Sequence, residues 1–314
     1  MDVTSIGYAG KILRVNLSDG KIWEEELDEA VIRKWVGGVG LGAKYLYDEV
    51  PPGVEWSDPE NRLIWTTGPL AGTDVAGAAT INIMGKGPMT NLGGASQANG
   101  FIGAYLKFSG FDGIIFEGKS PKLVYLQIRE GGAELKDAGH LAGKDVMELE
   151  DALREELGVK EHDVSVFGIG PAGENKVRFA CVSGDRGHVA GHNGLGAVMG
   201  AKNIKAVVVF QGKRTFGVFD PDLLKKRAKE LAEFAKSFGT VYEWGTGGGL
   251  STLYSLGALP IKNYTTNIYP EHERMNGQYL RNNFDIKSRP CYRCSVAHVK
   301  EVTVTEGPYT GFVG

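Results

Sequence analysis

The chain has 314 residues, of which 42% are hydrophobic and 23% charged, so it can bury a large core and is neither disordered nor fibrous. Its 35 basic and 38 acidic residues give a net charge of −3, which argues against nucleic-acid binding through a basic face, and no apolar run is long enough to span a membrane. The N-terminus lacks the pattern of a secretory signal and three cysteines suit a reducing compartment, so we expect a cytoplasmic protein.

The first part of the chain predicts a hairpin, two helices and several strands. Residues 12–17 and 21–26 alternate around Ser18-Asp19-Gly20, which is typical of a β-hairpin. The glycines from Gly38 to Gly42 lack the spacing of a phosphate-binding loop and are interpreted as a turn between helices. The predicted helices cover residues 29–36, about 42–49 and 101–108, and the predicted strands cover 62–67, 80–84 and 113–117.

The middle of the chain predicts a second hairpin, at 122–129 and 133–137, an amphipathic helix at 144–157, and strands at 164–167, 177–182 and 206–210. A helix from Asp220 to about residue 238 changes the texture of the sequence. We therefore expect an α+β unit over residues 1–214, followed over 215–314 by an incomplete helical unit that contains a Cys-x-x-Cys motif.

An internal repeat links residues 99–119 to residues 193–213. Each copy has Asn-Gly, a short helix, a turn, an apolar run that ends in phenylalanine, and Gly-Lys, in the same length without a gap. A glycine-rich loop, at 93–98 or 184–192, precedes each copy, and the 46 glycines of the chain are about twice the usual share. The repeat predicts a duplicated scaffold.

The two Asn-Gly pairs suggest a cradle for two equivalent anionic groups. Asparagine can cap a first helical turn, free N–H groups at a helix start favour an anion, and glycine lets a ligand approach the backbone. The alternative is that both pairs, Asn99-Gly100 and Asn193-Gly194, are ordinary turns that lead into helices.

His188 and His192 stand four residues apart beside Gly187 and Gly191. On a helix this spacing would allow metal binding, but the glycines favour a loop. We interpret the pair as imidazoles that donate hydrogen bonds to an anion, with an ordinary polar loop as the alternative.

Cys291 and Cys294 form a Cys-x-x-Cys motif, and His298 extends it to C-x₂-C-x₃-H. Such a motif binds a metal or an iron–sulfur cluster, or acts as a redox dithiol. Three ligands do not complete a tetrahedral or cluster site, so a fourth must come from elsewhere. Cys181, within a predicted strand, is interpreted as a core thiol.

In several motifs taken together the sequence resembles the tungsten-containing aldehyde:ferredoxin oxidoreductases, over nearly the whole chain. The stretches that carry the resemblance are Gly10-Lys11-Ile12-Leu13-Arg14-Val15-Asn16-Leu17, Thr67-Gly68-Pro69-Leu70-Ala71-Gly72-Thr73, Leu106-Lys107-Phe108-Ser109-Gly110-Phe111-Asp112, Gly170-Pro171-Ala172-Gly173-Glu174-Asn175 and Gly196-Ala197-Val198-Met199-Gly200-Ala201-Lys202.

The resemblance implies a base domain of two pseudo-symmetric β-sheets with helices, on which a tungsten (or molybdenum) bis-molybdopterin rests, with magnesium joining the pterin phosphates. It implies oxidation of an aldehyde to the acid and transfer of electrons through a [4Fe–4S] cluster to ferredoxin or another electron carrier. A homo-oligomer is compatible with it. The residues expected at the cofactor are Thr80, Gln97, Asn99, Gly100, His188, Val189, Gly191 and His192. The expected metal ligands are Cys291, Cys294 and His298.

Three departures from the family accompany the resemblance. Thr80, His188 and His192 stand where family members place arginines against the phosphates, and they offer weaker single hydrogen bonds than a guanidinium. His298 stands at the third cysteine of the cluster motif, so a four-cysteine cluster would lack a usual ligand. A family chain is about twice as long, and its other half holds the acid–base residues, so the 314 residues alone are expected to be inactive and no catalytic residue is assigned.

Two alternatives from other classes stay open. One is a truncated, non-catalytic scaffold or interaction module that keeps the base domain. The other is a small zinc-binding structural protein that uses Cys291, Cys294 and His298.

Overall fold

A computed structural model describes residues 6–213, 216–237 and 239–313. The chain divides into two compact units, Met1–Leu224 and Lys225–Gly314, so the division falls within helix α7 (Pro221–Lys236). The predicted boundary between residues 214 and 215 lies outside the described residues.

The first sheet has six strands in the spatial order β2-β1-β6-β3-β4-β5. Strands β1 and β6 run parallel, and every other neighbouring pair in the sheet is antiparallel. The strands are β1 (Lys11–Asn16), β2 (Ile22–Glu26), β3 (Leu63–Thr67), β4 (Ile81–Lys86), β5 (Gly93–Ala98) and β6 (Gly113–Glu117).

The second sheet repeats this topology in the order β8-β7-β12-β9-β10-β11. Here β7 and β12 are the parallel pair, and the other neighbours are antiparallel. The strands are β7 (Val124–Arg129), β8 (Gly132–Asp137), β9 (Val164–Gly168), β10 (Val182–Gly184), β11 (His188–Ala190) and β12 (Ile204–Phe210). Each strand of one sheet has a counterpart at the same place in the other, which confirms the predicted pair of pseudo-symmetric sheets.

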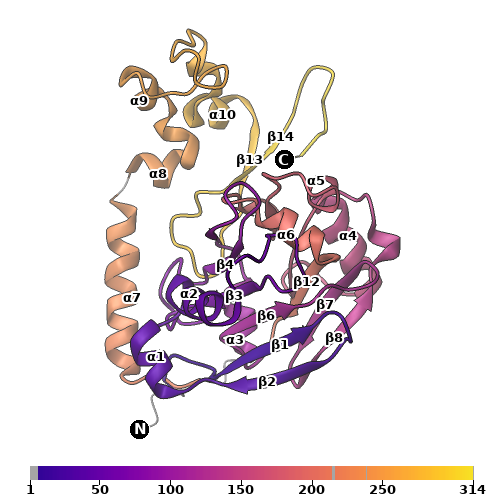
Figure 1. Ribbon diagram of the computed structural model, residues 1–314. Coiled ribbons are helices and arrows are strands. Elements are labelled where there is room, and N and C mark those ends of the chain that lie inside the picture. The colour runs from indigo at the N-terminus through magenta and orange to yellow at the C-terminus, as the bar shows by residue number, and fades with distance from the viewer. Residues whose placement is uncertain (1–5, 214–215, 238, 314) are drawn as a thin grey trace. The chain divides into compact units, whose positions relative to one another are not determined.

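Two short helices, α3 (Ile102–Phe108) and α6 (Leu195–Ala201), make contact with both sheets. Helix α3 contacts β3 of the first sheet and β9 and β12 of the second, while α6 contacts β12 of the second sheet and β3, β4 and β5 of the first. Every residue of both helices is buried, which explains why neither sequence has a polar face. Figure 1 shows both helices near the middle of the first unit, between α2 and α4.

The outer helices each cover one sheet. Helices α1 (Glu29–Trp35) and α2 (Gly38–Glu49) bury Ile32, Leu41 and Tyr45 in a core shared with the first sheet. Helix α4 (Val146–Leu157) begins at a capping box and buries Leu149 and Leu153 against the second sheet, and α5 (Pro171–Glu174) packs against α6.

The structure differs from three local predictions. Residues 38–42 form the start of α2, and the chain breaks instead at Val36 and Gly37, where Val36 has φ 61°. Of the strand predicted over residues 177–182, only Val182 belongs to a strand. The two glycine-rich segments predicted as loops, 93–98 and 184–192, contain the edge strands β5 and β11.

The second unit contains short helices and one hairpin. Its helices after α7 are α8 (Gly239–Trp244), α9 (Leu250–Ser255) and α10 (Gly277–Asn283), and its antiparallel strands are β13 (Asp285–Ser288) and β14 (Lys300–Thr303). The helices agree with the predicted helical unit, whereas the hairpin was not predicted.

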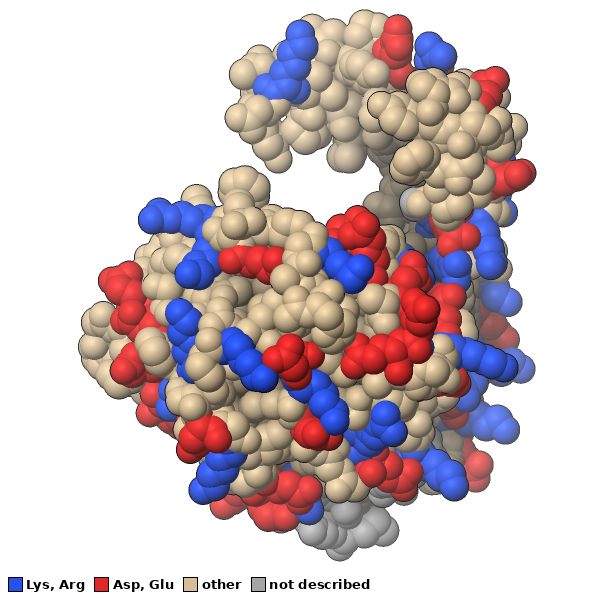
Figure 2. Space-filling view, turned by 90° about the vertical axis from the view of Figure 1, so that its right-hand side faces the viewer, with Lys and Arg blue, Asp and Glu red and all other residues tan. Residues whose placement is uncertain are grey.

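Among the described residues, no helix has both the length and the apolar composition to cross a bilayer. On the face of the molecule shown in Figure 2, lysine and arginine side chains are interspersed with aspartate and glutamate. This face therefore lacks the continuous basic surface that a nucleic-acid backbone attracts.

Candidate cofactor-binding site

The edge strands β5 and β11 of the two sheets contact each other and bring most of the candidate residues together. Gln97 lies on β5, and His188 and Val189 lie on β11. The backbone N–H of His192 donates a 2.9 Å hydrogen bond to Oγ of Ser96, so residue 192 lies beside the neighbour of Gln97. The two glycine-rich segments thus form one continuous strip, which we call the edge-strand surface.

Four candidate residues are exposed on this surface and can be reached by a ligand. Gln97, Gly191 and His192 are exposed, and Val189 retains 48% of its accessible area. His188 retains only 7% and lies on the buried side of β11. The interpretation of two imidazoles that act together on an anion is therefore not met, because His188 lies on the buried side of β11, whereas His192 follows the end of that strand and is exposed.

Thr80 and Asn99 support the site from below the surface. Thr80 Oγ1 donates a 2.5 Å hydrogen bond to Oδ1 of Asn99, and the Thr80 carbonyl accepts from Oγ1 of Thr67. These contacts connect the end of β3 and the start of β4 to the segment that leads into α3. The Thr80 hydroxyl hydrogen is thus engaged within the protein, so Thr80 serves to hold Asn99.

One N–H group at the start of each of the two helices α3 and α6 already donates a hydrogen bond within the protein. The N–H of Phe101, at the start of α3, donates a 2.6 Å hydrogen bond to Oδ2 of Asp185, and the N–H of Gly196, in the first turn of α6, donates to the Ala180 carbonyl at 3.0 Å. Both helices have only seven residues, so their dipoles are small. These two N–H groups are therefore not open to an anion, and the predicted pair of cradles stays a prediction for the remaining N–H groups of each helix start.

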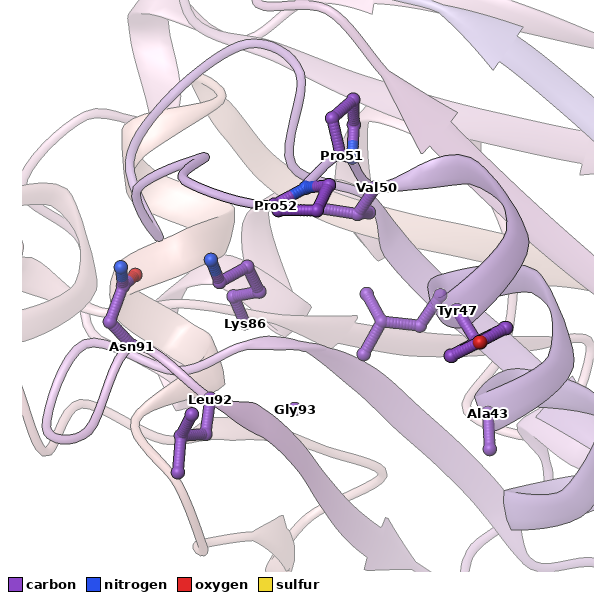
Figure 3. A pocket seen from close by; sticks show the side chains of 10 residues that line it. Ala43, Tyr47, Val50, Pro51, Pro52, Lys86, Asn91, Leu92 and Gly93 are labelled. Carbon is purple, nitrogen blue, oxygen red and sulfur yellow. The ribbon is translucent and has the colours of Figure 1, made fainter.

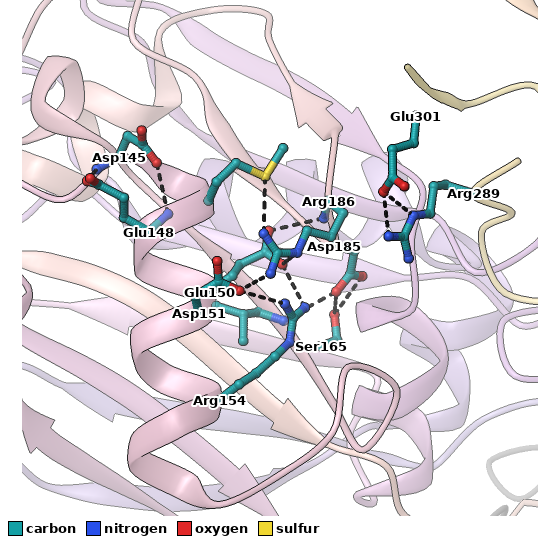
Figure 4. Close-up of polar contacts among 12 residues, drawn as sticks. Asp145, Glu148, Glu150, Asp151, Arg154, Ser165, Asp185, Arg186, Arg289 and Glu301 are labelled. Atoms are coloured by element: carbon teal, nitrogen blue, oxygen red, sulfur yellow. Dashed lines mark hydrogen bonds and ion pairs between the residues drawn. The ribbon is translucent and has the colours of Figure 1, made fainter. Parts of the chain in front are cut away.

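Asp185 is a functional candidate that the sequence did not reveal. Both of its carboxylate oxygens accept from Oγ of Ser165, at 2.9 and 2.8 Å, and the N–H of Val166 lies 3.3 Å from Oδ1 (Figure 4). Burial raises the pKa of Asp185 to about 7, against the opposing effect of the donors on Phe101 and Ser165. The available signal was Asp185-Arg186-Gly187, a typical turn sequence directly before His188.

Charged residues of α4 surround the hairpin that contains Asp185. Glu150 has no exposed surface, and its Oε2 accepts a 2.7 Å hydrogen bond from Arg154 while its Oε1 accepts from the N–H of Arg186 at 3.1 Å. The Arg186 guanidinium also pairs with Asp151 (Figure 4). Burial raises the pKa of Glu150 as well, so a second carboxyl group with a raised pKa lies near Asp185.

The cysteine motif of the second unit forms a tight turn. The N–H of Cys294 donates to the carbonyl of Cys291 at 3.0 Å. A hydrogen bond from the Cys291 thiol, assisted by the N–H groups of Ala297 and Val296, lowers the pKa of Cys294 to about 5, which favours a thiolate. The third predicted ligand, His298, is near enough for its charge to help lower the pKa of Cys294, but its Nδ1 is engaged 3.1 Å from Oγ1 of Thr246. Over the part of the chain that is described, no group of three histidine, cysteine or acidic side chains is arranged to hold a metal.

A separate groove of about 580 Å³ lies between α2 and the segment from β4 to β5 (Figure 3). Tyr47 and Leu92 border it with 88% and 68% of their surfaces exposed. Lys86 is the charged residue among its described lining, and its ammonium group already donates to the carbonyl of Val54. The groove is thus apolar and presents no acid–base pair.

Comparisons with known proteins agree with this architecture. The family model "Aldehyde ferredoxin oxidoreductase, N-terminal domain" matches residues 12–211, and "Aldehyde ferredoxin oxidoreductase, domains 2 & 3" matches residues 222–313. The tungsten-containing aldehyde ferredoxin oxidoreductase of Pyrococcus abyssi is 38% identical over 311 residues, which cover 96% of this chain and 51% of that protein.

Proteins with other names also match this chain over nearly its whole length. The aliphatic sulfonate oxidoreductase, WOR-like subunit, of Pyrococcus furiosus is 36% identical to this chain, and the match covers 98% of this chain and 51% of that protein. A chain of the active site complex BamBC of benzoyl coenzyme A reductase superposes with a TM-score of 0.82 at 29% identity, over 98% of this chain and 49% of that one. The chain spans about half the length of the curated relatives it matches. With family models matched over most of its length and two sheets of the same topology, the chain belongs to the aldehyde ferredoxin oxidoreductase family.

Proposed function

We propose that the chain forms the N-terminal part of a tungsten bis-molybdopterin oxidoreductase that oxidises aldehydes to carboxylic acids. The observation that supports this most is the edge-strand surface, where two pseudo-symmetric sheets present β5 and β11 side by side in a chain of this family. A cofactor with two equivalent pterins suits a surface built from two equivalent strands. When bound, the tungsten centre exchanges two electrons with the substrate, while the protein binds and orients it.

The residues of the edge-strand surface fit an anionic pterin. The Gln97 amide on β5 and the His192 imidazole, two residues past the end of β11, are exposed hydrogen-bonding groups, and Gly191 leaves the backbone accessible beside His192. Thr80, Asn99, Gly100 and His188 shape the surface from within. Magnesium is proposed to join the pterin phosphates.

The described residues do not fit a complete [4Fe–4S] cluster. Cys291 and Cys294 supply two thiols of the four that such a cluster uses, and His298 is turned toward Thr246. We assign Cys291 and Cys294 as a two-thiolate site, and we derive no electron-transfer step through it. Ferredoxin or a similar carrier is proposed as the electron acceptor, and the cytoplasm as the location of the protein.

Tungsten and pterin content tests the proposal. The 314-residue chain is produced with tungstate in a host that makes the pterin cofactor, and both components are quantified in the purified protein. We expect tungsten and pterin to copurify with the chain, and Gln97→Ala combined with His192→Ala to lower retention about ten-fold, since each substitution removes a hydrogen bond to a charged group.

The matched control is His140→Ala. His140 is an exposed histidine that follows β8, the edge strand opposite β11 in the second sheet, and it pairs with Glu156. This variant should retain as much tungsten as the unmodified chain. A chain that contains no tungsten or pterin would favour the scaffold alternative. Zinc without pterin would favour the zinc-binding alternative.

A further inference from the structure

Asp185 lies at the tip of the β10–β11 hairpin, in a strained turn. Asp185 and Arg186 both have positive φ angles, 47° and 59°, and Gly187 follows with φ 122°. Two successive non-glycine residues in the left-handed region are uncommon, because their Cβ atoms crowd the backbone. A turn of this kind persists where contacts around it hold it in place.

The contact that holds the tip connects the two pseudo-symmetric halves of the first unit, the first half being the part of the chain that forms β1 to β6 and the second half the part that forms β7 to β12. Asp185 belongs to the second half, and its Oδ2 accepts a 2.6 Å hydrogen bond from the N–H of Phe101, in the first half, 84 residues earlier. Ser165 on β9 donates to the same carboxylate and orients it. The tip of the hairpin is thus fixed against the start of α3.

The approach between the halves is closest at Gly100. A Cβ atom added at Gly100 would lie 2.5 Å from Oδ2 of Asp185, and Gly100 has φ +117°. Both facts require glycine at this position, so the segment that leads from β5 into α3 is shaped to receive this carboxylate. The same segment contains Asn99, and the hairpin continues into Val189 and His192.

We propose that Asp185 is a positioning residue that fixes the β10–β11 hairpin against the start of α3 and thereby aligns the two halves of the edge-strand surface. The hairpin carries Val189 and leads directly into Gly191 and His192, whereas β5 carries Gln97. Farther along the chain, hydrogen bonds at residues 192 and 193 also join this segment to the first half. The proposal rests on the proposed function only for the identity of the ligand.

The first test needs no cofactor. Amide hydrogen exchange is measured by mass spectrometry on the full chain and on Asp185→Asn, which preserves size but places an amide opposite the donors of Phe101 and Ser165. We expect exchange to be about ten-fold faster in two separate segments, 99–108 and 182–194, and unchanged in β7 and β12. Faster exchange in only one of the segments, or across the whole unit, would overturn the proposal.

Asp151→Asn is the matched control. Asp151 is an exposed carboxylate of the same charged group and pairs with Arg186. Among the hydrogen bonds described, the acceptor for the N–H of Phe101 is Asp185 and not Asp151. The control variant should leave both segments unchanged. If Asp185→Asn does not fold, Ser165→Ala removes only the orienting hydroxyl and should accelerate exchange in the same two segments; unchanged exchange in that variant would overturn the proposal.

The second test compares cofactor retention with stability. In Asp185→Asn we expect tungsten retention to fall about ten-fold, while Leu153→Ala, a destabilising change in the core under α4 and outside the edge-strand surface, keeps a larger share at an equal melting temperature. Retention that follows melting temperature alone in both variants would show a merely structural role and contradict the proposal. If the unmodified chain binds no tungsten, the proposed function fails, and the exchange experiment alone decides the role of Asp185.

Discussion

Asn193 donates a 2.8 Å hydrogen bond from Nδ2 to the backbone oxygen of Ala95, across 98 residues of sequence. Its side chain also covers Gly94, where an added Cβ would lie 2.8 Å from the Cβ of Asn193. The second half of the repeat therefore rests directly on the backbone of β5. This contact and the link through Asp185 join the halves at both ends of the edge-strand surface.

Gly94→Ala should destabilise the first unit. The new methyl group would meet the Asn193 side chain well inside van der Waals distance, and overpacking of this kind costs about 1–3 kcal/mol. The free energy of unfolding is measured by urea denaturation. Gly132→Ala is the control, since a Cβ there meets nothing within 4 Å and needs no unusual φ. Equal effects of the two substitutions would contradict the close approach.

The contribution of Asp185 to the stability of the first unit should fall as pH rises from about 4 to about 7. Burial raises the pKa of Asp185 to about 7, above its value in the unfolded chain, so the folded state binds the proton more tightly. The stabilisation is complete below the unfolded pKa and is lost as pH rises through the folded pKa, with a slope of up to about 1.4 kcal/mol per pH unit. The raised pKa of Glu150 acts in the same direction.

Urea denaturation of the unmodified chain and of Asp185→Asn at pH 5 and pH 7 measures this effect, because the buried lysines Lys107 and Lys202, with pKa values of about 8 and about 7, act in the opposite direction at higher pH. Asp185→Asn should remove a large part of the difference. The charged groups around Asp185, namely Glu150, Arg154 and Arg186, remain in that variant. Asp151→Asn should keep the slope. A stability that rises between the two pH values would count against the buried carboxyl groups as its source.

Replacing Lys107 should be among the most destabilising changes in the chain. Lys107 has no exposed surface, and its ammonium group donates to the carbonyls of Gly7, Gly68 and Pro69 and lies 3.8 Å from Asp112. Lys107→Met leaves these acceptors without a donor and the buried carboxylate without a cation. We expect a loss of about 3–5 kcal/mol in the free energy of unfolding.

The control is Lys122→Met, whose lysine pairs with Asp137 at 2.6 Å on the surface with 65% of its side chain exposed. An exposed ion pair contributes about 0–1 kcal/mol, so the two substitutions should differ clearly in urea denaturation. Similar losses would mean that the Lys107 contacts contribute little.

Cys294 should react with iodoacetamide at pH 6, well below the pH at which an ordinary thiol reacts. The hydrogen bond from Cys291 lowers the pKa of Cys294 to about 5, so its thiolate predominates above that pH. Peptide mass spectrometry follows the alkylation rate as a function of pH. Cys291→Ser should shift the midpoint, because it replaces the first of the donors, whereas His298→Ala should have a smaller effect. A midpoint near that of a free thiol in the unmodified chain would contradict the arrangement.

Local sequence patterns were sufficient to predict the elements that depend on local interactions. The hairpins β1–β2 and β7–β8 follow from alternation and turn residues, and α4 follows from its apolar face. Strand β5 could not be predicted in this way, because its glycines and alanines have low strand propensity, and β11 has three residues, too few to show an alternation. They become strands because β4 and β10 offer them a sheet edge to pair with.

Part of the candidate site was predictable from local sequence patterns, and part was not. Gln97 and His192 are polar residues within the glycine-rich segments, and both are exposed, Gln97 on β5 and His192 just after β11. The burial of His188 and the contact of Asp185 with Phe101 depend on how two distant segments pack, which no local pattern encodes. The resemblance to a family identified the scaffold, while the long-range contacts came from the structure.

The placement of α3 and α6 has a consequence for each half on its own. Each helix packs on the sheet of the other half as well as on its own, so a single copy of the repeat would leave an apolar sheet face and an apolar helix uncovered. Two identical copies could cover these surfaces only by associating around a two-fold axis. Each half therefore depends on the other for the burial of its apolar surface, so a single half produced alone should associate with a second copy or aggregate.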